Sequence, residues 1–301
     1  MRARVWPLVL GFSAGMAAGL AGAQLRTGAF AGLQEPVGAR GLGLGNALAA
    51  VADDPLALWW NPAGLSRMDE HSDQVSLGGA LLQQDRYDHC LAYAHRFDGQ
   101  GSLGLGFRQQ AVDKIDSYDA GGGSLGTLST QDLTLLLAWA TEVSYGFRYG
   151  VIAKGYYRDL ADQHAWGGGF DLGFFFTPYE GSYASLALVL KDLAGRLDWS
   201  QGRVEQTDTL LTVGLSDRWF EGQLLLSIDG GIPLAPDPAV LSHAGLEWRL
   251  ISAFAVRAGL DQLTPCAGLN WTVAPYVFDY AFEWDPDGLG NRQAGSLTLK
   301  F

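Results

Sequence analysis

Gly295-Ser296-Leu297-Thr298-Leu299-Lys300-Phe301 ends the chain. Counting back from Phe301, every second residue is apolar or small, and the residues between them are polar. Successive side chains of a strand point to opposite faces of a sheet. The segment therefore predicts a strand with one face in an apolar medium and the other in a polar medium.

The N-terminus predicts export. Arg2 and Arg4 precede an apolar stretch from Val5 to Leu20, and Ala21-Gly22-Ala23 follows as a small-x-small cleavage signal. This order is typical of a secretory signal peptide, which we expect to comprise residues 1–23. An uncleaved membrane anchor is the alternative, but the stretch is short and rich in glycine. Past this point no window of about 18 apolar residues could span a membrane as a helix.

From about residue 74 onward the chain is a series of segments that alternate with period two. Fourteen such segments are predicted, at residues 74–82, 88–97, 101–110, 130–140, 145–157, 166–177, 183–191, 206–216, 222–231, 240–249, 253–261, 264–272, 275–285 and 292–301. A bacterial single-chain barrel has an even number of strands. The pattern predicts an all-β fold, a transmembrane antiparallel β-barrel of about 14 strands over residues 73–301.

The predicted loops favour the same fold. If the first strand runs outward, the periplasmic connections are short, and the external ones include the longest, Ala111–Ser129, Asp192–Glu205 and Ile232–Ala239. Long external and short periplasmic loops are typical of outer-membrane barrels, as are tryptophan and tyrosine at strand ends. A soluble β-sandwich is the alternative, but it would leave the export signal and the terminal Phe301 unexplained.

Composition excludes several function classes. Removing residues 1–23 removes two arginines and no acids, so the net charge moves from −12 to −14. A chain this acidic lacks the basic face that nucleic acid requires, so no nucleic-acid partner is expected. Glycine supplies 41 of 301 residues, about twice the usual share of roughly 7%. Glycine within strands suits a wall that curves and packs tightly.

Catalytic and metal-binding patterns do not stand out. Cys90 and Cys266 fall on predicted lumen-facing positions of strands that are not neighbours, which disfavours a disulfide. With two cysteines and five scattered histidines, no metal-ligand spacing appears. The aspartates of the longest external loop, Asp113, Asp116 and Asp119, could bind a divalent ion, but a solvated loop is the default interpretation. We predict no catalytic residues, no metal and no cofactor.

Residues 24–72 do not alternate like strands and are predicted to be mainly helical. Asp53 or Asp54 before Pro55 predicts a helix N-cap with proline in the first turn. Asn61-Pro62 repeats this arrangement for a second short helix, which Gly64 could end. The small residues from Ala47 to Val51 favour a further helix that packs closely against a wall.

The string PVGARGLGLGNALAAVADDPLALWWNPAGL, residues 36–65, carries a specific resemblance. It resembles the N-terminal signature of the PorV/PorQ family, within the wider FadL-like (OmpP1-type) outer-membrane superfamily. In that family the signature forms a plug on the periplasmic side of a fourteen-stranded barrel. The resemblance implies a structural plug rather than a substrate contact for the motif positions, Gly38, Arg40, Gly43, Asp53, Asp54, Pro55, Asn61, Pro62 and Gly64.

The C-terminal strand also resembles the terminal strand of bacterial outer-membrane barrels. The resemblance implies that Leu297, Leu299 and Phe301 form a signal for the barrel-assembly machinery, with outer-membrane lipid as the other partner. The expected location is the outer membrane of a Gram-negative-type bacterium.

The sequence leaves the function open between three hypotheses. The FadL resemblance implies a gated barrel that passes a hydrophobic small molecule. The PorV resemblance implies an interaction barrel that handles secreted proteins of type IX secretion. The third hypothesis is a structural outer-membrane scaffold without transport. No pattern in the sequence identifies ligand-binding residues.

Overall fold

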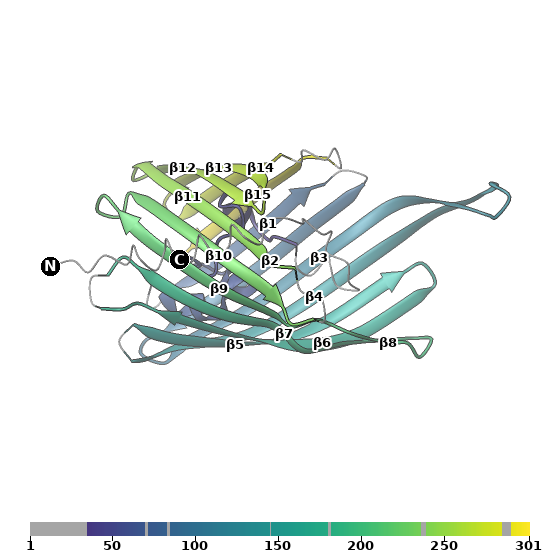
Figure 1. Ribbon diagram of the computed structural model, residues 1–301, viewed down its shortest axis with the longest axis horizontal. Coiled ribbons are helices and arrows are strands. Elements are labelled where there is room, and N and C mark those ends of the chain that lie inside the picture. Colours follow the sequence, from purple (N-terminus) through teal and green to yellow (C-terminus); the bar gives the residue numbers. More distant parts are fainter. Residues whose placement is uncertain are drawn as a thin grey trace.

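The computed structural model is a closed antiparallel β-barrel that encloses the N-terminal helical segment (Figure 1). The structure describes residues 35–69, 72–82, 85–144, 146–179, 182–235, 239–284 and 290–301. The predicted signal peptide, residues 1–23, and the start of the predicted plug, residues 24–34, lie outside the described residues.

Fourteen strands form the wall, and a fifteenth, β8, pairs only with β7. Their bounds are β1 Asp73–Leu81, β2 Arg86–Phe97, β3 Gly101–Tyr118, β4 Ser124–Ser144, β5 Phe147–Leu160, β6 Gln163–Phe176, β7 Ser185–Trp199, β8 Val204–Gln206, β9 Leu210–Trp219, β10 Leu224–Pro233, β11 Leu241–Ile251, β12 Phe254–Asp261, β13 Thr264–Val273, β14 Tyr276–Glu283 and β15 Arg292–Lys300. Wall strands that follow one another pair, and β1 pairs with β15 to close the barrel. The prediction of a 14-stranded antiparallel barrel is confirmed.

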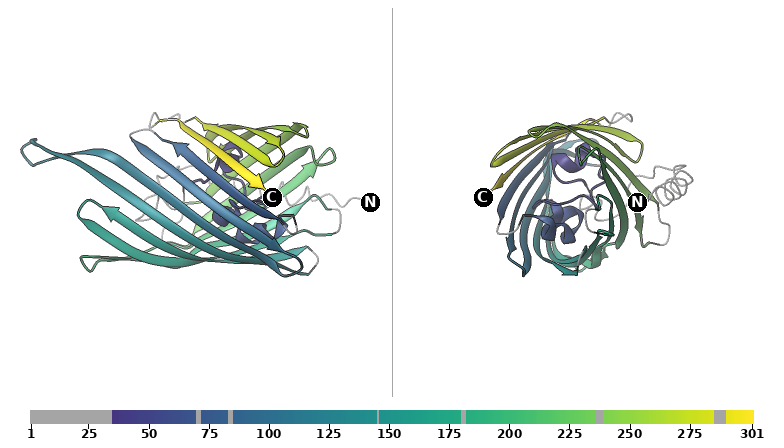
Figure 2. Two further views of the ribbon diagram at one scale, coloured as in Figure 1. Left: turned by 180° about the vertical axis from the view of Figure 1, so that it is seen from behind. Right: turned by 90° about the vertical axis from the view of Figure 1, so that its left-hand side faces the viewer.

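In the part of the chain that the structure describes, three short helices lie inside the barrel: α2 Ala39–Gly43, α3 Ala57–Trp60 and the 3₁₀ helix η2 Pro62–Arg67. Seen along the barrel, they lie within the ring of strands (Figure 2). α2 contacts β12–β15 and β1, whereas η2 contacts β2–β6, so the plug reaches opposite sides of the wall. Among the described residues, no helix is long and apolar enough to cross a membrane.

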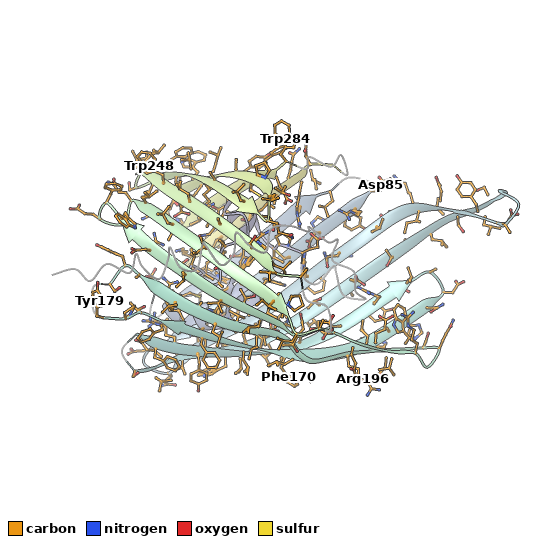
Figure 3. All side chains as sticks on the ribbon, in the orientation of Figure 1. Asp85, Phe170, Tyr179, Arg196, Trp248 and Trp284 are labelled. Atoms are coloured by element: carbon orange, nitrogen blue, oxygen red, sulfur yellow. The ribbon has the colours of Figure 1, made fainter. Side chains whose placement is uncertain are left out.

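The outer face of the wall is apolar, as the alternation predicts. On β4, Leu135 is 62% exposed and points outward, whereas its neighbours Thr134 and Leu136 are buried. Trp248 and Trp284 also point away from the barrel (Figure 3). A wide belt of exposed aliphatic and aromatic side chains would be unstable in water but is stable in lipid. The barrel therefore lies in the outer membrane.

The terminal strand has the predicted faces. Leu297 and Leu299 pair with Leu77 and Val75 on the outer side of β1. Thr298 is buried on the lumen side, where its Oγ1 lies 2.7 Å from the Oγ of Ser76. Phe301 exchanges two backbone hydrogen bonds of 2.9 Å with Asp73 and is itself exposed. The role of this strand as an assembly signal stays a prediction.

The external loops differ from the prediction. Much of the segment Ala111–Ser129 is strand, because β3 and β4 continue past the barrel as a paired hairpin, with Ile115 opposite Leu128. Figure 1 shows this hairpin, which we call the external arm, projecting from the end opposite the C-terminus. Similarly, much of Asp192–Glu205 is strand, because β7 runs to Trp199 and pairs with β8. Beyond the bilayer no face meets lipid, so these extensions lack the apolar alternation that identifies a membrane strand.

Candidate functional site

Glycines of the wall make room for the plug. A Cβ atom on Gly150 would lie 2.5 Å from the carbonyl carbon of Pro62, and one on Gly259 would lie 2.2 Å from the nitrogen of Gly45. Similar close approaches to the plug occur at Gly104, Gly106, Gly173, Gly214 and Gly245. Because real Cβ atoms do not approach backbone this closely, the wall is shaped to this plug. Part of the high glycine content is thereby explained.

Asn61 and Pro62 take the positions that the sequence predicts. Asn61 is buried at the N-cap of η2, where its Oδ1 accepts from the backbone N–H of Ala63 at 3.0 Å, and Pro62 is the first helical residue. The same amide donates to the carbonyls of Ala49 (2.8 Å) and Phe174 (3.2 Å). One side chain therefore starts a helix, fixes a plug turn and binds the wall.

Two other local predictions are wrong. Gly64 lies within η2 rather than at its end, and it is required by space, because a Cβ there would be 2.5 Å from the carbonyl oxygen of Ala52. The residues from Ala47 to Val51 form turns rather than a helix. The N–H of Val51 closes a turn on the carbonyl of Leu48 at 3.0 Å, while the N–H of Ala49 binds the wall, donating to Asp229 on β10 at 2.7 Å.

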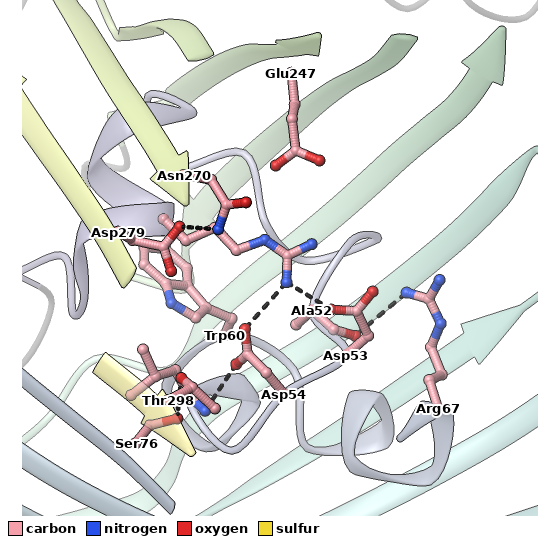
Figure 4. Close-up of polar contacts among 12 residues, drawn as sticks. Ala52, Asp53, Asp54, Trp60, Arg67, Ser76, Glu247, Asn270, Asp279 and Thr298 are labelled. Carbon is pink, nitrogen blue, oxygen red and sulfur yellow. Dashed lines mark hydrogen bonds and ion pairs between the residues drawn. The ribbon is translucent and has the colours of Figure 1, made fainter. Parts of the chain in front are cut away.

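Asp53 and Asp54 bind Arg40, at 2.5 and 3.0 Å (Figure 4). The predicted cap is found only in part. Asp54 Oδ1 accepts from the backbone N–H of Leu56 at 2.9 Å across Pro55, but the regular helix starts later, at Ala57. Burial alone would raise the pKa of the Asp53 carboxyl, yet Arg40 holds that pKa well below its usual range. Burial raises the pKa of the Asp54 carboxyl.

The remaining motif glycines pack inside the plug and against the wall. Gly38 has φ = 80°, a conformation that favours glycine, and a Cβ there would lie 2.6 Å from Leu56 Cδ1. A Cβ on Gly43 would lie 3.2 Å from the Cα of Gly268 on β13. All nine motif positions therefore lie in the plug, at positions that cap, pair or pack.

Charged wall residues hold the plug around its circumference. Lys191 on β7 donates to the carbonyl of Trp59 at 2.7 Å, and Asn46 of the plug donates to Asp261 on β12 at 2.6 Å. Arg292 on β15 binds the carboxylate of Glu35 at 2.6 Å. These contacts join β7, β12 and β15, so the plug is seated on well-separated parts of the wall.

A cavity of about 70 Å³ lies on the external side of the plug. Its apolar lining combines plug and wall residues: Leu58, Trp59, Trp60, Leu136, Tyr156, Leu210 and Leu241. Lys191, whose Nζ lies 5.4 Å from the centre of the Trp60 ring, and Asp229 also line it. We call this space the external cavity. It is a small space in which aromatic and aliphatic residues share the lining with six charged residues: Glu35, Arg108, Lys154, Lys191, Asp192 and Asp229.

A buried ion network forms part of the wall of this cavity, because Lys154, Tyr156 and Asp192 line it. Lys154 on β5 lies 2.7 Å from both Asp171 on β6 and Asp192 on β7, and Tyr156 donates to Asp192 at 2.7 Å. Asp192 has φ = 59° and sits where the β6–β7 register shifts. The network thus offsets part of the buried negative charge and fixes an irregular part of β7.

Cys90 and Cys266 are both free and buried. Among the described residues no group of three or more histidine, cysteine or acidic side chains could hold a metal ion. In the external arm, Asp113 accepts from Tyr87 at 3.2 Å, and Asp119 accepts from the backbone of Gly121 and Gly123. Asp113 therefore joins the arm to β2, and Asp119 holds the arm's own turn.

No protein-family model matches the chain, and no curated protein matches it. Solved structures do match in fold. The Ralstonia pickettii toluene transporter TbuX matches with a TM-score of 0.60 and 15% identity, over 87% of this chain and 96% of that one. The Pseudomonas putida toluene transporter TodX gives 0.63 and 13%, over 88% and 97%. A Pseudomonas aeruginosa FadL homologue gives 0.59 and 12%, over 89% and 98%. The chain thus has the fold of FadL-type barrels.

Proposed function

We propose that this barrel is a gated passage for hydrophobic small molecules across the outer membrane. The observation that carries the proposal is the external cavity, where aromatic and aliphatic side chains of the plug and the wall meet at the face of a tightly seated plug. Such a lining binds apolar ligands through buried surface. The fold agrees, because the similar structures are described as toluene transporters and a FadL homologue, none of them an enzyme.

The cavity is closed to such a ligand in this conformation. A cavity of about 150 Å³ is known to hold benzene, whereas the external cavity offers about 70 Å³. A monoaromatic ligand must therefore displace a side chain to enter. In this proposal the barrel is gated, its closed state is the one described above, and the plug is its barrier.

Toluene binding tests the proposal. Headspace gas chromatography over the purified protein in nanodiscs would measure how much toluene partitions onto it. Leu136→Trp should fill the cavity and lower binding at least tenfold, because Leu136 is a buried lining residue. Leu135→Trp is the matched control, since Leu135 is next to Leu136 in the sequence but its side chain faces lipid. Equal binding by both variants would contradict the proposal.

A second candidate function is an interaction barrel of the PorV/PorQ type that handles secreted proteins. It is supported by the plug motif and by the external arm, which carries exposed Tyr118 and Leu125 beyond the barrel. Excising residues 113–128 should abolish capture of a secreted protein while leaving toluene binding unchanged. If neither toluene nor a secreted protein binds, the scaffold hypothesis is favoured.

A further inference from the structure

A second cavity, of about 550 Å³, lies on the opposite, periplasmic side of the plug. Its floor is the plug surface that carries Asp53, Asp54 and Arg67 (Figure 4). Its sides are residues of β9, β11–β15 and β1, including the β13–β14 turn next to the C-terminus. We call it the periplasmic vestibule. It shares no lining residue with the external cavity.

Positive charge is concentrated in the vestibule. Six of the chain's 20 lysines and arginines line it, but only five of its 32 acidic residues do. The chain as a whole has a net charge of −12. The vestibule is therefore a local exception to an acidic protein, and neither the plug motif nor the proposed passage of apolar molecules accounts for it.

Most of the acids are already paired. Two arginines take four of the five carboxylates, in ion pairs of 2.5 to 3.0 Å: Arg40 with Asp53 and Asp54, and Arg257 with Glu247 and Asp279. The fifth acid, Asp69, is exposed. Each cluster has one arginine and two carboxylates and so a net charge of −1. With Asp69 and the four remaining cations included, the residues that line the vestibule carry a net charge of +1.

Four cations have no carboxylate within ion-pair distance among the described residues: Arg67, Arg218, Arg249 and Lys300. Arg67 is partly compensated, because it donates to the carbonyl of Ala52 at 3.2 Å and lies 4.1 Å from the centre of the Phe175 ring. The Arg218 side chain is half-buried and makes no hydrogen bond within the described part of the chain. Asp53 and Glu247 attract Arg218 only from beyond ion-pair distance. A half-buried charge without a directly bound counter-charge is costly, and a bound anion would reduce that cost.

We propose that the periplasmic vestibule binds an oxyanion, a carboxylate or phosphate group, on the unpaired guanidinium groups of Arg218 and Arg249. A guanidinium presents planar N–H donors that match both groups, so two of them facing one cavity favour such a ligand. Lys300, exposed at the rim, adds a third charge. The ligand is a small periplasmic anion or the head group of an anionic phospholipid of the inner leaflet. The proposal does not depend on passage of apolar molecules.

Two measurements distinguish a small periplasmic anion from a phospholipid head group as the ligand of the vestibule. Isothermal titration calorimetry would measure citrate and inorganic phosphate binding to the full chain in phosphatidylcholine nanodiscs. Native mass spectrometry would count phosphatidylglycerol retained by the protein from mixed nanodiscs. The double variant Arg218→Gln/Arg249→Gln should weaken binding at least tenfold. Arg196→Gln is the matched control, since Arg196 is exposed on the external side and pairs with Asp198 (Figure 3).

Each outcome of these measurements either supports or overturns the proposal. Citrate or phosphate binding that the double variant loses supports a soluble anion. Phosphatidylglycerol retention that it loses supports a head group. Lys300→Gln is a second variant that leaves the half-buried arginine intact, and it should weaken binding about threefold even if the double variant fails to fold. Absence of binding in both arms, or equal binding by the wild type and the folded variants, would overturn the proposal.

Discussion

Replacing Gly259 with alanine should loosen the plug. Gly259 lies on β12, and the new Cβ would be 2.2 Å from the nitrogen of Gly45 and 2.4 Å from the carbonyl carbon of Leu44. Both are backbone atoms, so no side-chain rotation relieves the clash and the plug turn must move. The same turn carries Asn46, whose hydrogen bond of 2.6 Å to Asp261 would then be stretched.

The size of the effect follows from these two contacts. Overpacking costs about 1–3 kcal/mol, and a hydrogen bond to a charged group contributes about 1.5–3 kcal/mol. Moving the turn relieves the clash while it breaks the bond, so the two costs do not add in full. We expect the free energy that holds the plug in its place inside the barrel to fall by about 2–4 kcal/mol. Since about 1.4 kcal/mol is a factor of ten, the unseated fraction should rise roughly 30- to 1,000-fold.

Planar-bilayer recording would measure this fraction as the open probability of single barrels. Trypsin cleavage after Arg40 and Arg67 would report exposure of the plug independently. Gly155→Ala is the matched control, because a Cβ at Gly155 on β5 meets no atom within 4 Å. If Gly259→Ala shows the same open probability and protease resistance as Gly155→Ala, the plug does not depend on the space left by the wall glycines and the prediction is wrong.

Three further predictions concern the plug and the terminal strand. Asn61→Ala should lower plug stability by about 1–2 kcal/mol through loss of the cap, seen as faster trypsin cleavage at an unchanged heat-modifiable gel shift. Leu299→Asp, or deletion of Phe301, should reduce insertion by the assembly machinery, because a charge in lipid costs up to about 2–4 kcal/mol and less for aspartate; normal insertion of both variants would argue against an assembly signal. Excising residues 24–66 should raise conductance from near zero to that of an open pore, and an unchanged conductance would mean that wall side chains alone fill the lumen.

The strands of the wall were predictable because one face of each strand meets lipid and the other meets the lumen, which makes apolar outward residues alternate with inward ones. Leu135 faces lipid and Leu136 faces the plug, and the sequence shows the same alternation in each membrane segment. The external arm carries no such constraint. Polar residues such as Asp116 and Thr127 pair across it as readily as apolar ones, so its sequence resembles a loop.

Inside the plug, the sequence predicted the structure correctly only where the interacting residues are close in sequence. Asn61-Pro62 caps its helix as predicted, because cap and helix are adjacent in sequence. The turns near Ala49 depend instead on Asp229, which is 180 residues away, and Asn46 depends on Asp261, 215 residues away. The unpaired Arg218 is equally invisible in the sequence, because its lack of a partner arises only when the barrel closes.

The part of the barrier that moves first should be a side chain and not the plug as a whole. The turn at Gly45 is wedged against the backbone of β12, so it cannot shift without moving a strand. Trp59 lines the external cavity, and its indole N–H has no hydrogen-bond partner among the described residues, so rotating it breaks no side-chain hydrogen bond. A ligand too large for about 70 Å³ would therefore enter most cheaply by turning Trp59 against a fixed plug. Ion flow and ligand entry are then separate events. We expect Trp59→Ala to raise toluene binding without raising conductance and Gly259→Ala to raise conductance, whereas a conductance increase with Trp59→Ala would show that one movement controls both.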